Sequence, residues 1–404
     1  MLNEKQLLVV NSVLKGLNIF LTGSPGTGKS YVLKEIISKY KLLKKGNIYI
    51  TATTGCAAVN INGITLHSLF GIKPNINIYT YVNKLLKVKF NNQIYKQIFF
   101  IDFLIIDEIS MLDDKLCDNI NYILKNIKNN DKPFGGIQIL FVGDFFQLAP
   151  VENSYCFNSK SWKELNPLLI ELTEPVRHNN DMAFQIILSK LRYGLINEKI
   201  YKILKLLKKN NFDNDEIKPT ILYPNNINVD KINKDNLNLL INNNYKYKTY
   251  YPQFYNIKPT NNFDIQLTEN SQIMVTRNIS INDQLINGTR GVVITLKDNS
   301  VIIKTQKGLY EINYYIDYIN NNNKKFIKFI PLKLAYAISI HKSQGTTIDK
   351  LKLDIGNNIF ANGQAYTALS RAKSLKDIQI ININYNSFKT DLNIIKWYNS
   401  QDNI

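Results

Sequence analysis

The amino-acid sequence predicts an α/β protein of two domains, with a small β-barrel inserted in the second. In residues 1–172, short apolar segments of strand length alternate with segments of helical periodicity. Several of the apolar segments are almost uninterrupted, which is typical of strands covered by helices on both faces of a parallel sheet. Residues 173–286 and 331–404 form the second α/β set, and residues 287–330 switch to short alternating segments separated by Gly and Asn turns.

The elements of the first domain follow from periodicity. Asn3 is placed to cap a helix whose apolar residues recur at helical spacing up to Leu17, and a second helix is predicted at residues 31–43. The predicted strands are residues 19–21, 48–51, 103–106 and 137–142. Strands alternating with helices in this way predict a doubly wound sheet.

The second domain repeats the alternation less regularly. Its predicted helices are residues 184–192 and 226–240, and its predicted strands are residues 220–223, 335–340 and 378–381. Within the inserted segment, strands are expected at residues 292–295, 301–304 and 326–330. The insertion is therefore expected to be a small β-barrel.

Composition excludes several classes of protein. The chain of 404 residues has three widely separated cysteines and three scattered histidines, so neither a disulfide scaffold nor a zinc or iron–sulfur framework is expected. The apolar run at residues 98–106 is too short to cross a bilayer, and the first residues lack the apolar core of a signal peptide. We expect a soluble intracellular protein without membrane contact, in a compartment that the sequence does not specify.

The charge favours a polyanionic partner. Fifty basic and 32 acidic side chains give a formal net charge of +18, and neutralising phosphates releases condensed counterions. However, Asn, Ile, Lys and Tyr are abundant throughout, and their codons are rich in A and T, so genome composition accounts for part of this excess. The motifs must decide the function.

A phosphate-binding loop lies between a predicted strand and a predicted helix. Its glycines let backbone N–H groups face a phosphate, and the following helix N-terminus adds positive charge. Lys29 is expected to reach the β- and γ-phosphates of ATP, and Ser30 to ligate Mg²⁺. The loop consists of Gly23, Ser24, Pro25, Gly26, Thr27, Gly28, Lys29 and Ser30.

Acidic and polar residues follow two further buried strands. Asp107 and Glu108 end one of them, where the first carboxylate can hold the metal and the second can activate water. Gln147, after the next strand, can sense the γ-phosphate or orient the attacking water. These residues predict ATP hydrolysis, although a small-molecule P-loop kinase would contain the same loop.

Further motifs resemble the PIF-type helicases, 5′-to-3′ DNA helicases of superfamily 1 type B, which are related to RecD-like enzymes. The resemblance covers nearly the whole chain, and residues 132–138 and 338–345 are its most diagnostic segments. The other matching segments are Gln6, the phosphate loop and residues 51–58, 63–71, 105–112, 143–150, 337–346 and 364–372. The resemblance implies two tandem RecA-like domains, a small wedge insertion at about residues 72–98 and an SH3-like fold for the barrel.

The resemblance also implies roles for single residues. Gln6 would contact the adenine and Gly345 the nucleotide. Arg177 and Arg371, which spacing alone would leave as surface or salt-bridged arginines, would close on the γ-phosphate together with Gln147. Nucleotide binding would draw the two domains together, and hydrolysis would release them.

A path for single-stranded DNA is expected along loops at strand ends. Hydroxyl, imidazole and ammonium donors there suit phosphates and read little sequence. The candidates are Thr53, Thr54, His67, Ser68, His341, Lys342, Ser343 and Thr346. Taken singly, the Thr and Ser residues also fit helix capping. Phe70 is expected in the core.

The sequence therefore predicts an ATP- and Mg²⁺-dependent motor that moves 5′ to 3′ on single-stranded DNA and unwinds forked or tailed duplexes. Replication, repair and recombination are the expected processes, proteins of replication or recombination are candidate partners, and a monomer is expected. The alternative is a nucleic-acid-stimulated ATPase that acts as a switch without strand separation. RNA as the track also stays open.

Overall fold

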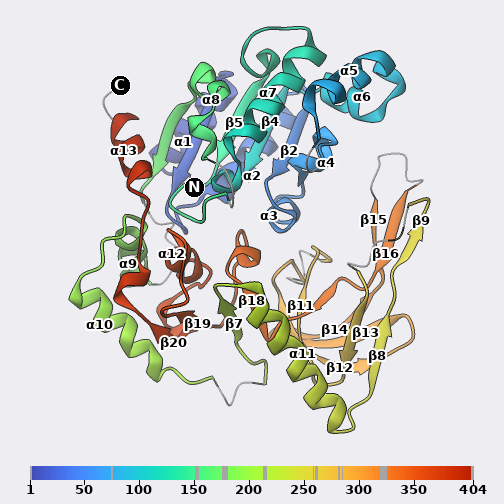
Figure 1. Cartoon of the computed structure of the whole chain (residues 1–404), viewed down its shortest axis with the longest axis vertical. Coiled ribbons are helices and arrows are strands. Elements are labelled where there is room, and N and C mark those ends of the chain that lie inside the picture. The colour runs from blue at the N-terminus through green and yellow to red at the C-terminus, as the bar shows by residue number, and fades with distance from the viewer. Residues whose placement is uncertain are drawn as a thin grey trace. The chain divides into compact units, whose positions relative to one another are not determined.

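The computed structural model describes residues 2–73, 76–150, 154–174, 181–212, 216–257, 259, 263–280, 283, 285–318 and 325–401. The chain folds into two compact units, drawn in Figure 1 and described separately here. Unit 1 consists of Met1–Ile196, Ala361–Ser370 and Phe388–Ile404, and unit 2 of Asn197–Phe360 and Arg371–Ser387. Among the described residues, no helix is both long enough and apolar enough to pass through a membrane.

Unit 1 is built on a six-stranded parallel sheet with the order β3-β2-β4-β5-β1-β6 (Figure 1). The strands are β1 (Ile19–Gly23), β2 (Ile48–Ala52), β3 (Ile64–Thr65), β4 (Phe103–Asp107), β5 (Gln138–Val142) and β6 (Leu168–Leu172). The α-helices are α1 (Glu4–Leu14), α2 (Lys29–Leu42), α3 (Gly55–Asn60), α4 (Leu66–Phe70), α5 (Ile78–Val88), α6 (Gln93–Phe99), α7 (Asp114–Lys128), α8 (Lys160–Leu165), α9 (Met182–Arg192), α12 (Gln364–Leu369) and α13 (Leu392–Gln401). The predicted strands of the first domain coincide with β1, β2, β4 and β5.

The core of unit 1 explains why its central strands are apolar on both faces. All five residues of β1 are buried, and Ile19 and Leu21 pack with Val10 of α1 and Ile36 of α2. On the other face, Phe20 contacts the rings of Phe145 and Trp162. A strand between two layers of helices has no solvent-facing side, which is why the sequence lacks alternation there.

The segment expected to be a wedge contains two helices. These are α5 and α6, connected by the short 3₁₀ helix η1 (Lys89–Asn91). Phe90 of η1 contacts Tyr95 and Phe99 of α6, so the connecting 3₁₀ helix packs against α6. Strand separation by this segment stays a prediction.

Unit 2 contains a four-stranded parallel sheet with the order β18-β7-β19-β20. Its strands are β7 (Thr220–Tyr223), β18 (Ala337–Ser339), β19 (Leu351–Ile355) and β20 (Ile378–Ile383), and its α-helices are α10 (Glu198–Leu206) and α11 (Asn226–Asn242). The predicted strands at residues 220–223, 335–340 and 378–381 overlap β7, β18 and β20, and both predicted helices of the second domain are present as α9 and α11. Sequence reasoning did not find β19.

The antiparallel part of unit 2 is larger than the predicted insertion. A five-stranded sheet has the order β14-β13-β12-β11-β17, a three-stranded sheet the order β15-β16-β9, and β8 pairs with β10. The strands are β8 (Tyr247–Tyr250), β9 (Gln253–Tyr255), β10 (Ile265–Thr268), β11 (Gln272–Val275), β12 (Arg290–Leu296), β13 (Ser300–Thr305), β14 (Gly308–Asn313), β15 (Tyr315–Tyr318), β16 (Phe326–Phe329) and β17 (Leu332–Leu334). Antiparallel structure thus begins at Tyr247, not at residue 287, because Tyr250 and Leu267 share one core with Val301 and Ile303. An SH3-like fold stays a prediction.

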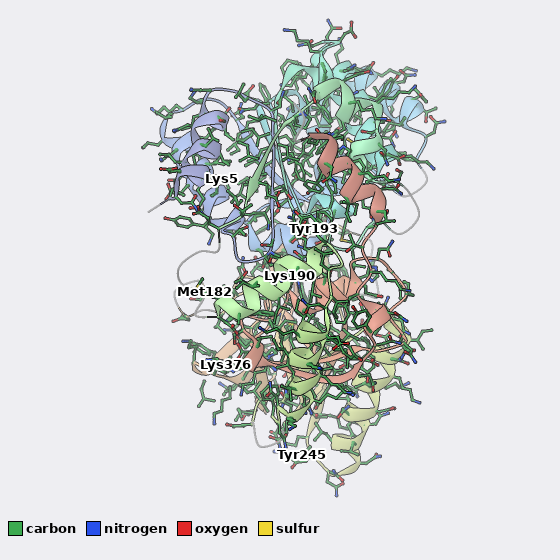
Figure 2. The ribbon with its side chains drawn as sticks, turned by 90° about the vertical axis from the view of Figure 1, so that its left-hand side faces the viewer. Lys5, Met182, Lys190, Tyr193, Tyr245 and Lys376 are labelled. Atoms are coloured by element: carbon green, nitrogen blue, oxygen red, sulfur yellow. The ribbon has the colours of Figure 1, made fainter. Side chains whose placement is uncertain are left out.

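The two units also differ from the predicted domain boundary at residue 172. Residues 173–196, 361–370 and 388–404, predicted for the second domain, lie in unit 1. In Figure 2, the labels Met182 and Lys190 mark α9, which lies in the first of these segments, and Tyr193 marks the residue at its C-terminal end. Arg192 of α9 is ion-paired with Asp144, Tyr366 of α12 bonds the same carboxylate, and Trp397 of α13 stacks on Phe157. A helical period shows that a helix has an apolar face, not which sheet that face covers.

Candidate nucleotide and nucleic-acid sites

The phosphate-binding loop connects β1 to α2. Gly23 has a φ of 141°, and a Cβ there would lie 2.4 Å from the carbonyl oxygen of Leu172, so only glycine fits. Gly28 is the N-cap of α2 with a φ of 90°, and it has no side chain that could occupy the amides of the first turn. The Tyr31 amide donates to Gly28 O at 3.0 Å, so the amides of Lys29 and Ser30 are those that can face an anionic ligand.

Lys29 lies against the loop backbone. Its Nζ donates to the carbonyl oxygens of Gly23 at 2.6 Å and Ser24 at 3.1 Å. Desolvation lowers the pKa of Lys29, Arg192 adds to this effect, and the charges of Asp144, Glu108 and Asp107 oppose it. A desolvated ammonium held by weak carbonyl acceptors is a strong partner for a phosphate.

The side chain of Gln6 is buried and forms hydrogen bonds both to the start of α1 and to the phosphate-binding loop. Its Oε1 accepts from the amide of Asn3, which caps α1, and its Nε2 donates to the carbonyl oxygen of Thr27 at 3.2 Å. The predicted N-cap and the predicted adenine residue thus form one capping box next to the phosphate loop. The adenine contact itself stays a prediction.

The acidic pair lies at the end of β4. Asp107 Oδ1 accepts from the amide of Glu108 at 2.9 Å, and Glu108 adopts a left-handed backbone with a φ of 52°. Burial raises the pKa of Asp107, and the neighbouring Glu108 carboxylate raises it further. Thr53 joins this pair, because its amide donates to Asp107 O and its Oγ1 donates to Glu108 O.

The donors present fit a magnesium ion that is shared with a nucleotide. In the part of the chain that the structure describes, no group of three or more His, Cys, Asp or Glu residues could hold a metal. Mg²⁺ is usually bound through one or two protein oxygens, phosphate oxygens and waters. Ser30 in the first turn of α2 and Asp107 at the end of β4 could supply those protein oxygens.

Asp144 and Gln147 follow β5 and are buried. The Gln147 amide donates to Asp144 O at 3.0 Å, and this bond closes a tight loop after the strand. Asp144 accepts from the Tyr366 hydroxyl at 2.7 Å and from Arg192 Nε at 2.9 Å. Asp144 is thus a structural anchor for the loop that carries Gln147.

Arg192 is a site residue that sequence reasoning missed. Its side chain is 3% exposed, and it forms ion pairs with Asp144 and Glu171. These charges hold the pKa of Arg192 well above its usual range although burial acts in the opposite direction. A sequence signal exists, because position 192 lies one helical turn after Leu188, on the apolar stripe of α9.

Of the two arginines predicted to act in phosphoryl transfer, only Arg371 lies among the described residues. Arg177 lies outside the described residues. Arg371 is buried in unit 2, where its Nη1 lies 3.5 Å from the carbonyl oxygen of Ser343 and 3.4 Å from that of Thr346. Gly345, with a φ of 78°, lies between those two residues. The structure thus brings Arg371 to the segment of Gly345 within one unit.

The unit 1 residues predicted for DNA differ in exposure. Thr54 caps α3 by accepting from the amide of Ala57, as the capping alternative predicts, and Thr53 is engaged with Glu108. His67 and Ser68 are exposed on α4, whereas Phe70 is fully buried, as expected. His67 and Ser68 are therefore the members of this group that face solvent.

The unit 2 residues predicted for DNA divide in the same way. The Ser343 hydroxyl donates to Ile340 O and the Thr346 hydroxyl to Ser343 O, and both side chains are buried. His341 begins the 3₁₀ helix η6 (His341–Ser343), burial lowers its pKa, and its ring lies nearly parallel to that of the exposed Phe360, 6.4 Å away. The hydroxyls of Ser343 and Thr346 thus stabilise the loop that presents His341 and Lys342.

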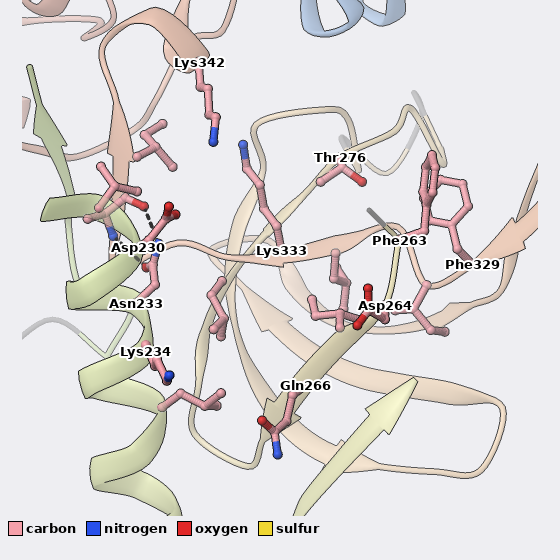
Figure 3. A pocket seen from close by; sticks show the side chains of 18 of the residues that line it. Asp230, Asn233, Lys234, Phe263, Asp264, Gln266, Thr276, Phe329, Lys333 and Lys342 are labelled. Carbon is pink, nitrogen blue, oxygen red and sulfur yellow. Dashed lines mark hydrogen bonds between the residues drawn. The ribbon is translucent and has the colours of Figure 1, made fainter. Parts of the chain in front are cut away.

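A pocket of about 660 Å³ in unit 2 extends from Lys342. Its walls come from α11, β10, β16, β17 and β18. In Figure 3, the ammonium groups of Lys342 and Lys333 converge on one end of this pocket, and the rings of Phe263 and Phe329 lie at the other. These two rings are 4.9 Å apart. Cations and aromatic rings along one groove are features that bind single-stranded nucleic acid.

Curated proteins resemble almost the whole chain. The "ATP-dependent DNA helicase PIF1" of Xenopus laevis is 33% identical over 98% of this chain, and the chain covers 64% of that relative. The "ATP-dependent DNA helicase RRM3" of Saccharomyces cerevisiae is 30% identical over 98% of this chain, which covers 67% of it. The chain thus spans just under two thirds of the PIF1 relative's length.

Solved structures agree with this likeness. The Pif1 helicase from Candida albicans has a TM-score of 0.84 and 32% identity, with 99% of both chains covered. Bacteroides Pif1 in complex with ADP-AlF4 has a TM-score of 0.79 and 27% identity, with 100% of this chain and 97% of that chain covered. Bacteroides Pif1 bound to single-stranded DNA has a TM-score of 0.73 and 27% identity, with 99% and 97% covered. The family model described as PIF1-like helicase matches residues 1–199. The chain belongs to the PIF1-like helicase family.

Proposed function

We propose that this protein is an ATP-dependent DNA helicase that moves 5′ to 3′ on single-stranded DNA and unwinds duplex DNA ahead of it. The observation that carries the proposal is the charge cluster around Lys29. This ammonium lies on the phosphate loop, within electrostatic range of Asp107, Glu108 and Asp144. A phosphate-binding cation beside two strand-end carboxylates is the arrangement that nucleotide hydrolysis requires.

The residues of unit 1 then have distinct roles in hydrolysis. Lys29 and the amides of the first turn of α2 hold the β- and γ-phosphates. Ser30 and Asp107 would hold Mg²⁺, which would neutralise charge on the phosphates when bound, and Glu108 accepts the proton of the attacking water. Gln147 orients that water, and Arg177 and Arg371 stabilise charge that develops on the γ-phosphate.

Single-stranded DNA is proposed to contact exposed or partly exposed donors in each unit. In unit 1 these are His67 and Ser68 of α4. In unit 2 they are His341 and Lys342 of η6 and the groove that begins at Lys342. Phosphate contacts without base readout suit a motor, which must accept any sequence.

Polarity is tested with duplexes that carry one single-stranded tail. We expect ATP-dependent strand separation of a 5′-tailed duplex and of a fork, and none of a 3′-tailed duplex of the same sequence. The measurement is the release of a fluorescently labelled strand. Efficient unwinding from the 3′ tail would contradict the polarity. ATP hydrolysis that DNA stimulates without any strand release would instead favour the switch ATPase, and an RNA tail of the same sequence tests the track.

The groove of unit 2 is tested through the salt dependence of DNA binding. The logarithm of the affinity for oligo(dT) should fall linearly with the logarithm of the salt concentration, with a slope of about −0.7 per phosphate contact. Lys342→Ala should make the slope less negative by about one contact, or roughly 0.7. Fluorescence anisotropy between low and moderate salt measures this.

Lys376 supplies the matched control for that experiment. It is an exposed lysine of unit 2 that does not line the groove, and it is labelled in Figure 2. Lys376→Ala removes the same charge and should leave the slope unchanged. Equal effects of the two substitutions would mean that net charge, and not the groove, holds the strand.

A further inference from the structure

The carboxylate of Asp144 connects three segments of unit 1 that are distant in sequence. It is fully buried, and both of its oxygens have partners. Oδ1 accepts from Arg192 Nε at 2.9 Å and from the Phe146 amide at 3.3 Å, and Oδ2 accepts from the Tyr366 hydroxyl at 2.7 Å. One side chain thus joins the loop after β5 to α9 and to α12.

The guanidinium of Arg192, the ion-pair partner of Asp144, has several further contacts. Arg192 pairs with Glu171 as well as Asp144, and its Nη2 lies 3.4 Å from the Thr22 hydroxyl. The Phe146 ring lies 4.6 Å from its guanidinium carbon, and the Tyr398 ring 5.5 Å. Two carboxylates and aromatic rings together orient the planar guanidinium.

The segments joined by Asp144 are those that lead to the predicted γ-phosphate residues. Gln147 follows Asp144 directly, and its amide bonds Asp144 O. The segment with Arg177 precedes α9, whose last residue is Arg192, and Arg371 follows α12, which contains Tyr366. The loop and α12 also touch directly, because the Leu148 amide donates to Thr367 Oγ1 at 3.2 Å and a Cβ on Gly363 would lie 2.4 Å from Phe146 O.

Net stability is a weak reason for such a cluster. A buried ion pair loses solvation on both partners, and apolar packing of the same volume is often as stabilising. What the pair provides in addition is a fixed direction for each bond. Arg192 is the ion-pair partner of Asp144, whereas Lys29 Nζ donates to the carbonyl oxygens of the phosphate loop.

We propose that Asp144, Arg192 and Tyr366 form a positioning cluster that sets Gln147 and the helix α12, which Arg371 follows in the chain, for phosphoryl transfer. None of the three touches the nucleotide in this proposal, which rests on the proposed ATP hydrolysis. The cluster acts by fixing the backbone from which the reacting groups extend, so its loss should affect the transition state more than the bound nucleotide.

Tyr366→Phe is the main test, because it removes one hydroxyl and keeps the ring. We expect kcat for ATP hydrolysis to fall about tenfold, the size expected for losing a hydrogen bond to a charged group. KM and the affinity for ADP should change less than twofold. The affinity for ADP with aluminium fluoride, a mimic of the transition state, should fall by the same factor as kcat. Arg192→Lys keeps the charge but not the planar fork, and we expect a larger fall of the same kind.

Tyr155→Phe is the matched control. Tyr155 is a buried residue of unit 1 whose hydroxyl donates to Asp391 Oδ2 at 3.3 Å, and neither residue belongs to the phosphate loop or to the Asp144 cluster. It likewise loses one hydroxyl-to-carboxylate bond, so its melting temperature should fall, by less than that of Tyr366→Phe because its bond is longer and less buried, with kcat unchanged. If Tyr366→Phe lowers only the melting temperature, or weakens ADP and ADP with aluminium fluoride equally, the cluster is merely structural and the inference is wrong.

Failure of the inference is distinguishable from failure of the proposed function. Rates are measured with and without single-stranded DNA for the wild-type protein and each variant. A wild-type protein whose ATP hydrolysis does not respond to DNA would contradict the proposed motor. A wild-type protein that responds normally, together with a Tyr366→Phe variant of unchanged kcat and unchanged affinity for the mimic, would contradict only the positioning cluster.

Discussion

Glu108→Gln is expected to lower kcat for DNA-stimulated ATP hydrolysis by a factor of about 10² to 10⁴, the range for loss of a general base. Glutamine has nearly the same shape but cannot accept the proton of the attacking water. The left-handed backbone at Glu108 and the bond from Thr53 to its carbonyl oxygen do not depend on the carboxylate, so the loop should keep its form. Steady-state hydrolysis and binding of a fluorescent ATP analogue measure the two effects, and binding should persist.

Glu164 offers the control for that substitution. It is an exposed carboxylate of unit 1, paired with Lys125 at the surface, and Glu164→Gln should leave the rate of hydrolysis unchanged. Turnover of Glu108→Gln at the rate of the wild-type protein would refute Glu108 as the base. Loss of nucleotide binding in the same variant would mean instead that Glu108 supports the loop or the metal.

Lys29→Ala is expected to have the second large effect, a loss of at least about 10³ in kcat/KM for ATP together with weakened nucleotide binding. The desolvated ammonium of Lys29 is the cation that contacts the phosphate loop carbonyls, and a phosphate would take their place. Hydrolysis assays and nucleotide titrations measure the loss.

Lys29→Ala should not lower the stability of the protein, although it lowers activity. Because desolvation lowers the pKa of Lys29, the folded state without nucleotide disfavours its charged form, and removing the ammonium should not lower the melting temperature. Lys34→Ala, at an exposed position of the same helix, is the control and should keep full activity. A Lys29→Ala variant that hydrolyses ATP normally would exclude this loop as the nucleotide site.

Most strands of both parallel sheets could be predicted because their signal is local. The apolar segments that became β1, β4 and β5 are almost uninterrupted, and a buried strand needs nothing else. The strands β8 to β10 were missed because they lie in a stretch rich in Asn, Tyr and Lys, where no clear alternation marks them. The burial of Tyr250 in β8 and Leu267 in β10 depends on an antiparallel core formed by residues far along the chain, and β9 pairs with the distant β16.

In the candidate site too, the residues that could be predicted are those with a local sequence signal. The phosphate loop and the pair Asp107–Glu108 each follow a strand within a few residues, so their chemistry could be inferred from adjacent positions. Hydroxyl residues were harder to assign, because a threonine or serine has several local acceptors. Thr54 became a helix cap, and Ser343 and Thr346 bond their own loop.

The sequence by itself determined the family, the nucleotide loop and the carboxylates beside it, since each is encoded in a contiguous segment with a fixed local geometry. Only the tertiary structure decided that α9, α12 and α13 belong to unit 1 and that Arg192 is buried against Asp144. The physical reason is that an ion pair between positions 48 residues apart leaves no periodic trace. A buried arginine is tolerated only where folding brings enough opposite charge and hydrogen-bond acceptors around it.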